Sequence, residues 1–240
     1  MSVIFFDTET TGNGERDRLV ELAVKERGVA EPIINALYKP PIPIPIDAMA
    51  IHHITEKMVA LKPPFTGAPE YDSLKDLFED DDTIAVAHNA AFDVSILARE
   101  GIVPKNVICT YKVASTLDPD DRIPQYRLQY LRYLLGIEIE AEAHDALGDV
   151  LVLEAVFERL LAKMMERHGS EEAALDAMTA ISARPLLFTT IRFGKYNGKR
   201  LDEVAREDPE YLSWLLAQKR QNPEGETDWI HTLEHYLALA

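Results

Sequence analysis

Short apolar runs separated by turn-forming residues occupy the first part of the chain. The runs are Val3–Phe6, Leu19–Val24 and Ile33–Tyr38, and Gly, Asn and Pro residues lie between them. Branched and aromatic residues in runs of this length are typical of β-strands, and the short connections predict antiparallel neighbours. We therefore expect a meander of three strands, followed by an extended connection over the proline-rich stretch 40–45.

The pattern then alternates between strand-like and helix-like segments. Strands are expected at 84–87 and 107–110, and helices at 92–100, 112–116, 145–168 and 171–181. Across 150–164, apolar residues recur at the three- and four-residue spacing of an amphipathic helix. A mixed β-sheet flanked by helices, in the α/β class, is the simplest architecture for this order of elements.

A second, smaller unit is expected after the composition changes near Gly169. The predicted division is a main domain at 1–167, a helical linker at 168–185 and a small C-terminal α+β domain at 186–240. In the C-terminal domain, Leu186–Phe193 and the turn-forming residues 194–199 predict a hairpin. Two helices are expected to follow the hairpin, over 202–218 and 228–239.

The composition fits a globular chain and restricts its partners. Hydrophobic residues make up 47% of the 240, and no segment approaches the ~20 apolar residues of a membrane span. The N-terminus has no signal-type segment and Cys109 is the single cysteine, so we expect a cytoplasmic protein. The net charge of −16 argues against a broad nonspecific polyanion binder. An enzyme acting on nucleic acid is still compatible with this charge if metal ions neutralise the phosphate at the reaction centre.

Asp7 and Glu9 follow the first apolar run directly. Successive side chains of a strand alternate faces, so these two carboxylates point the same way. Two acids on one face at the end of a buried strand repel each other and are costly to desolvate. A hard divalent cation such as Mg²⁺ or Mn²⁺ removes that cost. A metal site is one interpretation of this pair, and a solvated turn at a strand end is the other.

Further acids stand at the starts of two predicted helices. Asp93 lies where the strand 84–87 turns into a helix. It is either a first-turn acid that suits the helix dipole or a side chain presented beside the two acids of the first strand. His144 precedes the long helix, Asp145 is a natural N-cap, and Asp149 lies one turn in. Apolar residues on the next turn favour an inward-facing Asp149 over a solvated one.

These residues occur in three short motifs. They are Asp-x-Glu on the first strand, Asp93 after His-Asn-Ala-x-Phe, and His-x-Ala-x-x-Asp at 144–149. Together and in this order they resemble the DEDDh exonucleases of the ribonuclease H-like superfamily. The histidine subclass is indicated, because the tyrosine subclass needs Tyr at position 145, where this chain has Asp. The segments 48–55, 184–196 and 208–212 resemble exodeoxyribonuclease X-like members of this family, and the resemblance is weakest around 117–129.

The resemblance implies a metal-dependent 3′–5′ exonuclease with a role in DNA repair. Such an enzyme hydrolyses single- or double-stranded DNA from 3′ ends to nucleoside 5′-monophosphates. The family's catalytic positions fall on Asp7, Glu9, Asp93, His144 and Asp149. Two Mg²⁺ ions are implied, for which Mn²⁺ can substitute, with Asp7 bridging them. Glu9 and Asp149 would complete the first metal site, Asp93 would support the second, and His144 would act as general base on the water.

Substrate contacts are expected from Thr10, Thr11, Gly12, His52, Asn89, Phe92 and Arg127. By resemblance, His52 flanks the terminal nucleotide, and a buried structural histidine is a close alternative. Arginines at 122–132, interleaved with tyrosines, could line a strand-binding groove or belong to the core. Lys195, Lys199 and Arg200 could grip a phosphate backbone or form a solvated hairpin tip.

Other functions stay open on the sequence alone. An exoribonuclease on the same scaffold is one, since no residue reads the 2′-hydroxyl explicitly. A proofreading subunit is another, with the C-terminal domain binding a polymerase or repair partner. A homodimer is also open. A non-catalytic nucleic-acid-binding module is disfavoured, because all five catalytic residue types are present and the chain is acidic.

Overall fold

The computed structural model describes residues 1–139, 146–221, 223 and 225–239. The chain divides into two compact units. The first contains Met1–Leu117 and Gln125–Ser182, and the second contains Asp118–Pro124 and Ala183–Ala240. Among the described residues, no helix is both long enough and apolar enough to cross a membrane.

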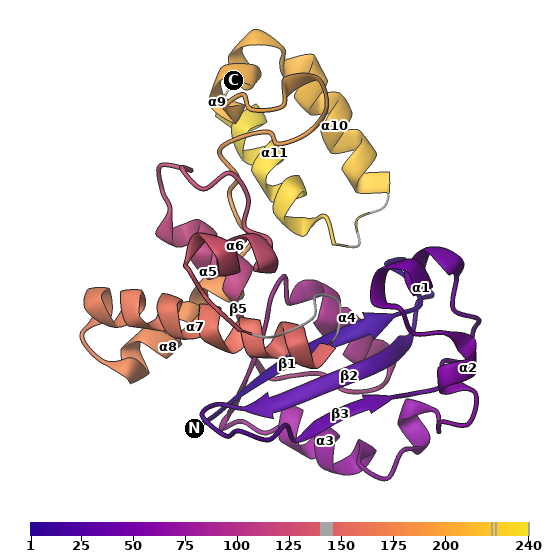
Figure 1. Cartoon of the computed structure of the whole chain (residues 1–240). Coiled ribbons are helices and arrows are strands. Elements are labelled where there is room, and N and C mark those ends of the chain that lie inside the picture. The colour runs from indigo at the N-terminus through magenta and orange to yellow at the C-terminus, as the bar shows by residue number, and fades with distance from the viewer. Residues whose placement is uncertain (140–145, 222, 224, 240) are drawn as a thin grey trace. The chain divides into compact units, whose positions relative to one another are not determined.

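A five-stranded mixed sheet forms the centre of the first unit (Figure 1). Its strands are β1 (Ser2–Thr10), β2 (Leu19–Glu26), β3 (Ile34–Leu37), β4 (Thr83–Ala87) and β5 (Asn106–Cys109), in the order β3-β2-β1-β4-β5. β2 runs antiparallel to both β1 and β3, whereas β4 runs parallel to both β1 and β5. The predicted meander and the predicted mixed sheet are therefore confirmed.

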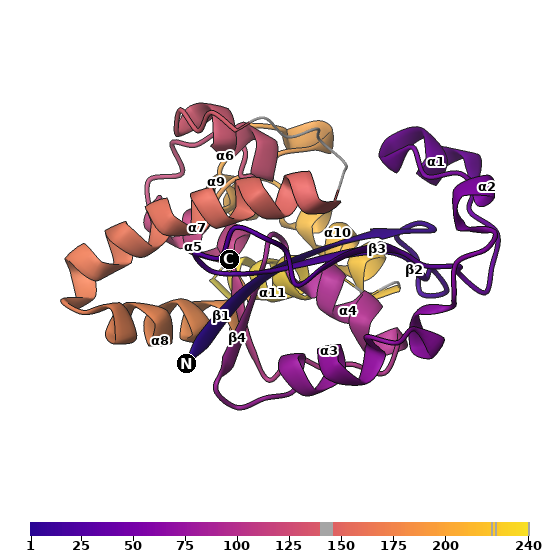
Figure 2. The same ribbon diagram turned by 60° about the horizontal axis from the view of Figure 1, so that its bottom comes forward.

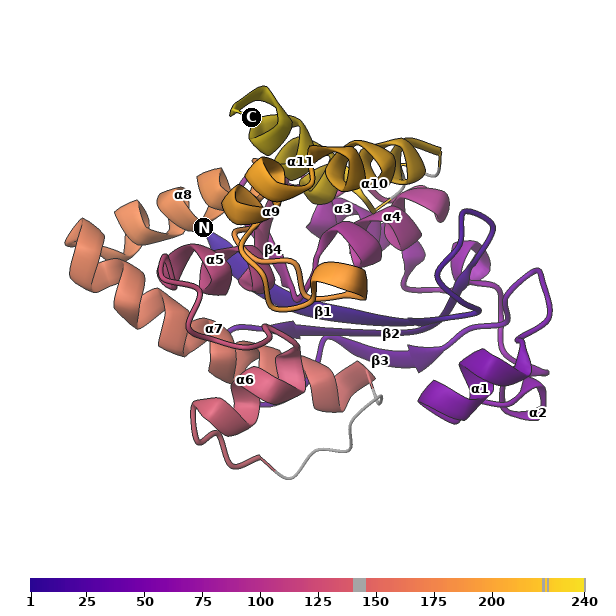
Figure 3. The ribbon, with the colours of Figure 1, turned by 90° about the horizontal axis from the view of Figure 1, so that it is seen from above.

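Helices cover both faces of this sheet, as Figure 2 shows. α7 (Ala146–His168) packs on β1 and β2, and α8 (Glu171–Ser182) packs on β5. On the opposite face, α3 (Tyr71–Phe78) packs on β4 and α4 (Ala91–Arg99) on β1. α6 (Leu128–Leu134) lies against α7 (Figure 3). The remaining elements are α1 (Ile46–His52), α2 (Glu56–Val59), a 3₁₀ turn at Phe65–Gly67 and α5 (Thr110–Leu117).

Alternation along β1 sorts its side chains between these two layers. Phe6 packs edge-to-face on Phe78 of α3, with ring centroids 5.1 Å apart. Phe5 packs in the same way on Phe157 of α7, at 5.2 Å. Because side chains two apart share a face, Asp7 and Glu9 follow Phe5 onto the side of the sheet that α7 covers.

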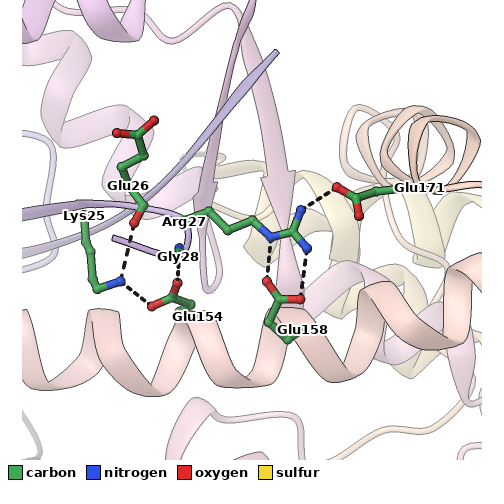
Figure 4. A network of polar contacts seen from close by, with 7 residues as sticks. All are labelled: Lys25, Glu26, Arg27, Gly28, Glu154, Glu158 and Glu171. Carbon is green, nitrogen blue, oxygen red and sulfur yellow. Dashed lines mark hydrogen bonds and ion pairs between the residues drawn. The ribbon is translucent and has the colours of Figure 1, made fainter. Parts of the chain in front are cut away.

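A set of ion pairs, the β2–α7 network, holds α7 beside the end of β2 (Figure 4). Its members are Lys25, Arg27, Glu154, Glu158 and Glu171. The buried Lys25 Nζ donates to Glu154 at 2.6 Å, and the Gly28 amide donates to the second oxygen of Glu154 at 2.9 Å. Arg27 donates to both oxygens of Glu158, at 2.6 and 3.0 Å, and to Glu171 at 2.6 Å. This network connects β2 with α7 and α8.

The second unit is largely helical, with α9 (Leu201–Glu207), α10 (Pro209–Gln221) and α11 (Thr227–Leu239) around a small core. The predicted single helix over 202–218 is wrong, because the chain breaks at Asp208, whose φ is −147° and ψ 67°. A residue before proline is disfavoured in helical conformation, and Pro209 lacks the N–H that a continuous helix needs.

The predicted hairpin of the second unit is reduced to one bridge between Thr190 and Arg200. The Ile191 amide bonds to Lys199 and the Leu201 amide to Thr189, at 2.9 and 2.8 Å, and then α9 begins. The residues between form a short 3₁₀ turn, Gly194–Tyr196. The strand-like backbone pairing therefore ends where helix α9 begins.

Candidate active site

Three carboxylates from distant parts of the first unit meet beside the sheet. Asp7 and Glu9 come from the second half of β1, and Asp149 comes from the first turn of α7. One carboxylate oxygen of each lies within 4.8 Å of those of the other two. We call these three residues the acid cluster. The structure thus brings together three of the four predicted metal ligands.

The electrostatics of the cluster suit a divalent cation. Burial raises the pKa of Asp7 well above its usual range, and the charges of Asp93, Asp149, Glu9 and Glu21 raise it further. A set of oxygen donors whose negative charges oppose one another is what Mg²⁺ and Mn²⁺ bind in proteins. The residues present therefore fit the metal that the sequence predicts.

Asp93 lies beside the cluster on the other layer. It is buried in the first turn of α4, and its Oδ1 accepts from the Thr8 amide at 3.1 Å and the Thr8 hydroxyl at 2.7 Å. Burial raises the pKa of Asp93 to about 7, although the two bonds from Thr8 oppose that rise. The hydrogen bonds fix this carboxylate on β1, one residue from both Asp7 and Glu9 along the strand.

Gln129 is a site residue that the sequence reasoning missed. Its side-chain amide Nε2 donates to Asp149 Oδ1 at 2.6 Å, and its Oε1 accepts from Arg132 Nη1 at 3.2 Å. Arg132 also donates to the Ile139 carbonyl. Gln129 lies on α6, twenty residues before its partner, and no local pattern marks it. Only the packing of α6 on α7 reveals this contact.

Glu21 is a second missed residue, and here the sequence held a signal. It pairs with Glu9 across the β1–β2 ladder and is 8% exposed. The amide of Ala146, the first residue of α7, lies 3.5 Å from its Oε2. A lone acid within the apolar run Leu19–Val24 could have been recognised as an acid facing the site rather than the core.

The residues after the acids form a self-contained turn. Thr10 Oγ1 donates to the Gly12 carbonyl at 2.6 Å, and Thr11 Oγ1 donates to Asp17 at 2.7 Å. Gly12 has φ +154°, and a Cβ there would lie 2.7 Å from the Asp17 carboxylate. Only glycine fits at this position. The predicted role of these three residues in substrate binding stays a prediction.

The other predicted substrate contacts lie at helix ends. His52 is buried at the end of α1, and its Nδ1 accepts from the Ile54 amide at 3.0 Å. Asn89 is exposed with φ +59° just before α4, and Phe92 is half-buried in its first turn. Arg127 is exposed at the N-cap of α6.

His88, from the same motif as Asn89, is structural. Its Nε2 lies 2.7 Å from the Tyr126 carbonyl and its Nδ1 2.9 Å from the Thr110 hydroxyl. Burial lowers the pKa of His88 to about 4, so its ring is neutral at neutral pH. It anchors the segment that leads into α6. His144, the predicted general base, lies outside the described residues.

Comparisons with known proteins agree with this geometry. The exonuclease family model matches residues 4–157, and the exodeoxyribonuclease X-like C-terminal family model matches residues 191–220. Exodeoxyribonuclease 10 of Escherichia coli K12 is 35% identical over 235 residues, 96% of this chain and 96% of that one. DNA polymerase III subunit epsilon of Treponema pallidum is 34% identical over 174 residues, 68% of this chain and 78% of that one.

A solved structure shows the same relationship in three dimensions. Exonuclease X in complex with 5′ overhanging duplex DNA is 29% identical, with a TM-score of 0.58. The match covers 75% of this chain and 99% of that chain. Structures of exonuclease I, at 21% identity and a TM-score of 0.56, share the fold. The chain therefore belongs to the exonuclease family and carries the C-terminal region of its exodeoxyribonuclease X-like members.

Proposed function

We propose that this enzyme removes nucleotides from the 3′ ends of DNA as nucleoside 5′-monophosphates, with Mg²⁺ at the acid cluster. The observation that carries the proposal is the convergence of Asp7, Glu9 and Asp149 within 4.8 Å. Support for a DNA substrate comes from the 35% identical exodeoxyribonuclease, which is similar over almost the whole chain. A role in DNA repair is part of the same proposal.

The chemistry is the addition of water across one phosphodiester bond. A water oxygen bonds to phosphorus while the bond from phosphorus to the 3′ oxygen of the preceding nucleotide breaks. When bound, two divalent cations would polarise the phosphate and the water and neutralise the leaving oxygen. Asp7, Glu9 and Asp149 would hold the cations, and Asp93, fixed by Thr8, would support them from the other layer.

The proton of the attacking water needs an acceptor. We assign this role to His144, because an imidazole with a pKa near neutrality suits general-base catalysis. Replacement of His144 by Ala should then lower turnover by about 10²–10⁴-fold while the protein stays folded. Turnover like that of the wild type would exclude His144 from the mechanism.

The proposed function is tested by digestion of end-labelled substrates. Single-stranded DNA, blunt duplex DNA and matched RNA, labelled at either end, are incubated with Mg²⁺, with EDTA, and with the Asp7→Ala variant. We expect Mg²⁺-dependent, stepwise release of 5′-mononucleotides from DNA 3′ ends, absent in the variant. If no substrate is cleaved while DNA is still bound, the chain is a binding module and the proposal is wrong.

Two alternatives act through the same site. An exoribonuclease would degrade the matched RNA faster than the DNA in that assay. A polymerase-bound proofreading subunit is suggested by the similarity to subunit epsilon, but that similarity covers only 68% of this chain. The similarity to exodeoxyribonuclease 10 covers 96% of this chain, which favours an exodeoxyribonuclease over a polymerase subunit.

A further inference from the structure

A row of aromatic side chains lies on the second unit, outside the acid cluster. Lys195 Nζ stands 4.7 Å from the ring centroid of Tyr196, and the Tyr196 ring is 4.9 Å from that of Tyr211. The Tyr211 ring is 5.7 Å from that of Trp214, with 39° between the ring planes. We call these four residues the aromatic row. It runs from a charged end to a tryptophan that is 55% exposed.

One carboxylate, that of Asp208, bonds to three of the four residues of the row. Asp208 Oδ2 accepts from the Tyr196 hydroxyl at 2.7 Å and from Lys195 Nζ at 3.0 Å. Its Oδ1 accepts from the Tyr211 amide at 3.1 Å. Asp208 is also the residue at which the chain breaks between α9 and α10. The bend between these helices therefore fixes the spacing of the rings, and little conformational entropy is lost when a ligand stacks on them.

The surroundings of the row are not those of a protein-binding patch. Over residues 188–220, all of which the structure describes, the exposed large hydrophobic residues are Phe193, at 36%, and Trp214, at 55%. The cores of protein–protein interfaces are apolar over a wider area than two side chains. Tyr196 meets Tyr211 edge-to-face at 76°, whereas the Trp214 indole is inclined at 39° to Tyr211, so a flat ligand can stack on the exposed indole with Tyr211 beside it.

The charge of this region also favours a nucleic acid. Residues 183–240 contain eight Lys and Arg against nine Asp and Glu, whereas residues 1–182 contain 17 against 32. A polyanion is therefore repelled least at the second unit. Lys195 is 63% exposed at its side chain, and its ammonium, which bonds to Asp208 and to the Tyr196 side chain, has a third donor that a phosphate oxygen could accept.

We propose that the aromatic row is a stacking platform for unpaired bases of single-stranded DNA, with Lys195 facing the phosphate backbone. The proposal rests on the proposed function, because it takes the substrate class to be DNA. Bases of any identity stack on aromatic rings, so the platform would bind strands without reading their sequence. Nearby basic side chains form ion pairs with acidic ones, such as Lys199 with Glu207 at 3.2 Å. Stacking rather than charge therefore supplies most of the affinity, and binding should depend only weakly on salt.

The test measures binding in a full-length variant that cannot cleave DNA, Asp7→Asn. Trp229→Phe is added so that Trp214 is the only tryptophan and reports on its own environment. The probe is an oligothymidylate of ten nucleotides, compared with a blunt duplex that has no unpaired bases. We expect quenching of Trp214 fluorescence by the oligonucleotide and little quenching by the duplex.

Two substitutions complete the experiment. Trp214→Ala should weaken oligothymidylate binding by about tenfold or more, and Trp214→Phe, which keeps a ring, should weaken it less. Leu239→Ala is the control, because Leu239 is 72% exposed in the same unit and lies outside the row. Unchanged affinity in Trp214→Ala, an equal loss in Leu239→Ala, or equal quenching by the blunt duplex would each overturn the proposal.

This outcome is separable from failure of the proposed function. Binding is measured without cleavage, so the platform can be established or overturned whatever the catalytic result. Conversely, wild-type protein that cleaves neither DNA nor the p-nitrophenyl ester of thymidine 5′-monophosphate would contradict the exonuclease proposal. That small ester has no strand to stack, so its hydrolysis reports on the acid cluster alone.

Discussion

Helix α7 presents acids at two places, and the partners of these acids differ. At its start, Asp149 meets two other carboxylates in the acid cluster. One to three turns later, Glu154 and Glu158 meet the cations of the β2–α7 network. Both regions join α7 to the first two strands, and both bring charged groups out of water.

The difference separates a structural role from a functional one. In the network, each buried or half-buried charge has an opposite charge within hydrogen-bonding distance, so desolvation is compensated within the chain. In the cluster, burial and neighbouring acids raise the pKa of Asp7, so the fold maintains a repulsion that a bound cation would relieve. Substitutions in the two regions should therefore have opposite effects on stability and activity.

The largest effect is expected from Asp7→Ala. It should lower DNA cleavage by at least about 10³-fold, because the cation site loses its central carboxylate. In EDTA, its melting temperature should equal or exceed that of the wild type, because carboxylate repulsion is relieved. Turnover and thermal unfolding measured on the same preparation check both parts. An unfolded variant would instead identify Asp7 as a structural residue.

Lys25→Met should lower stability and leave DNA cleavage almost unchanged. It leaves Glu154 partly buried without its cation, which should lower the free energy of unfolding by about 3–5 kcal/mol. Urea denaturation measures this loss. At temperatures where the variant is folded, cleavage should stay near the wild-type rate.

The double variant Lys25→Met, Glu154→Leu is the matched control for that prediction. Removal of both charges should restore most of the lost stability, because two apolar side chains no longer need compensation. If the double variant is as unstable as Lys25→Met alone, the ion pair is not the source of the loss.

Gln129→Ala should have a smaller effect, confined to the acid cluster. Loss of the 2.6 Å bond to Asp149 frees a ligand carboxylate to rotate, which should weaken Mn²⁺ binding by about tenfold. Electron paramagnetic resonance of free Mn²⁺ measures the affinity directly. Gln129→Glu keeps the side-chain volume but replaces the amide donor with a further acid, so it should not restore the Mn²⁺ affinity. If the loss in Gln129→Ala came only from the missing side-chain volume, Gln129→Glu would restore the affinity.

A last expected effect is a pH dependence of stability in EDTA. The pKa of Asp93 rises from its ordinary value near 3.8 to about 7 on folding, so the unfolded chain binds fewer protons than the native one between these values. The Asp93 contribution therefore destabilises the protein as pH increases from about 4 to about 7. Asp93→Asn, which keeps an acceptor for Thr8, should remove this contribution.

Urea denaturation of both proteins at several pH values checks the sign. The measured quantity is the difference in unfolding free energy between wild type and Asp93→Asn. The wild type should lose stability relative to Asp93→Asn as the pH rises. Saturating Mg²⁺ should diminish that trend, because a bound cation stabilises the carboxylate form. A difference that does not change with pH would contradict the raised pKa.

Most elements of the fold could be predicted from the sequence, because their patterns are local. The strand at 84–87 and the long helix ending at His168 correspond to β4 and α7. The break at Asp208 was missed, although Pro209 marks it, because apolar residues continue at helical spacing on both sides. The predicted hairpin around 186–199 depended on pairing over several residues, and the structure forms only one bridge.

The sequence by itself determined that Asp7 and Glu9 share a face, because the side-chain period of a strand is two residues. It also determined that Asp149 lies in the first turn of a helix, since helix starts are set by local residue types. Only the tertiary structure decided that Asp149 meets the two strand acids, and that Glu21 and Gln129 surround them. These contacts depend on how α6 and α7 pack on the sheet, and packing is set by side chains distant in the sequence.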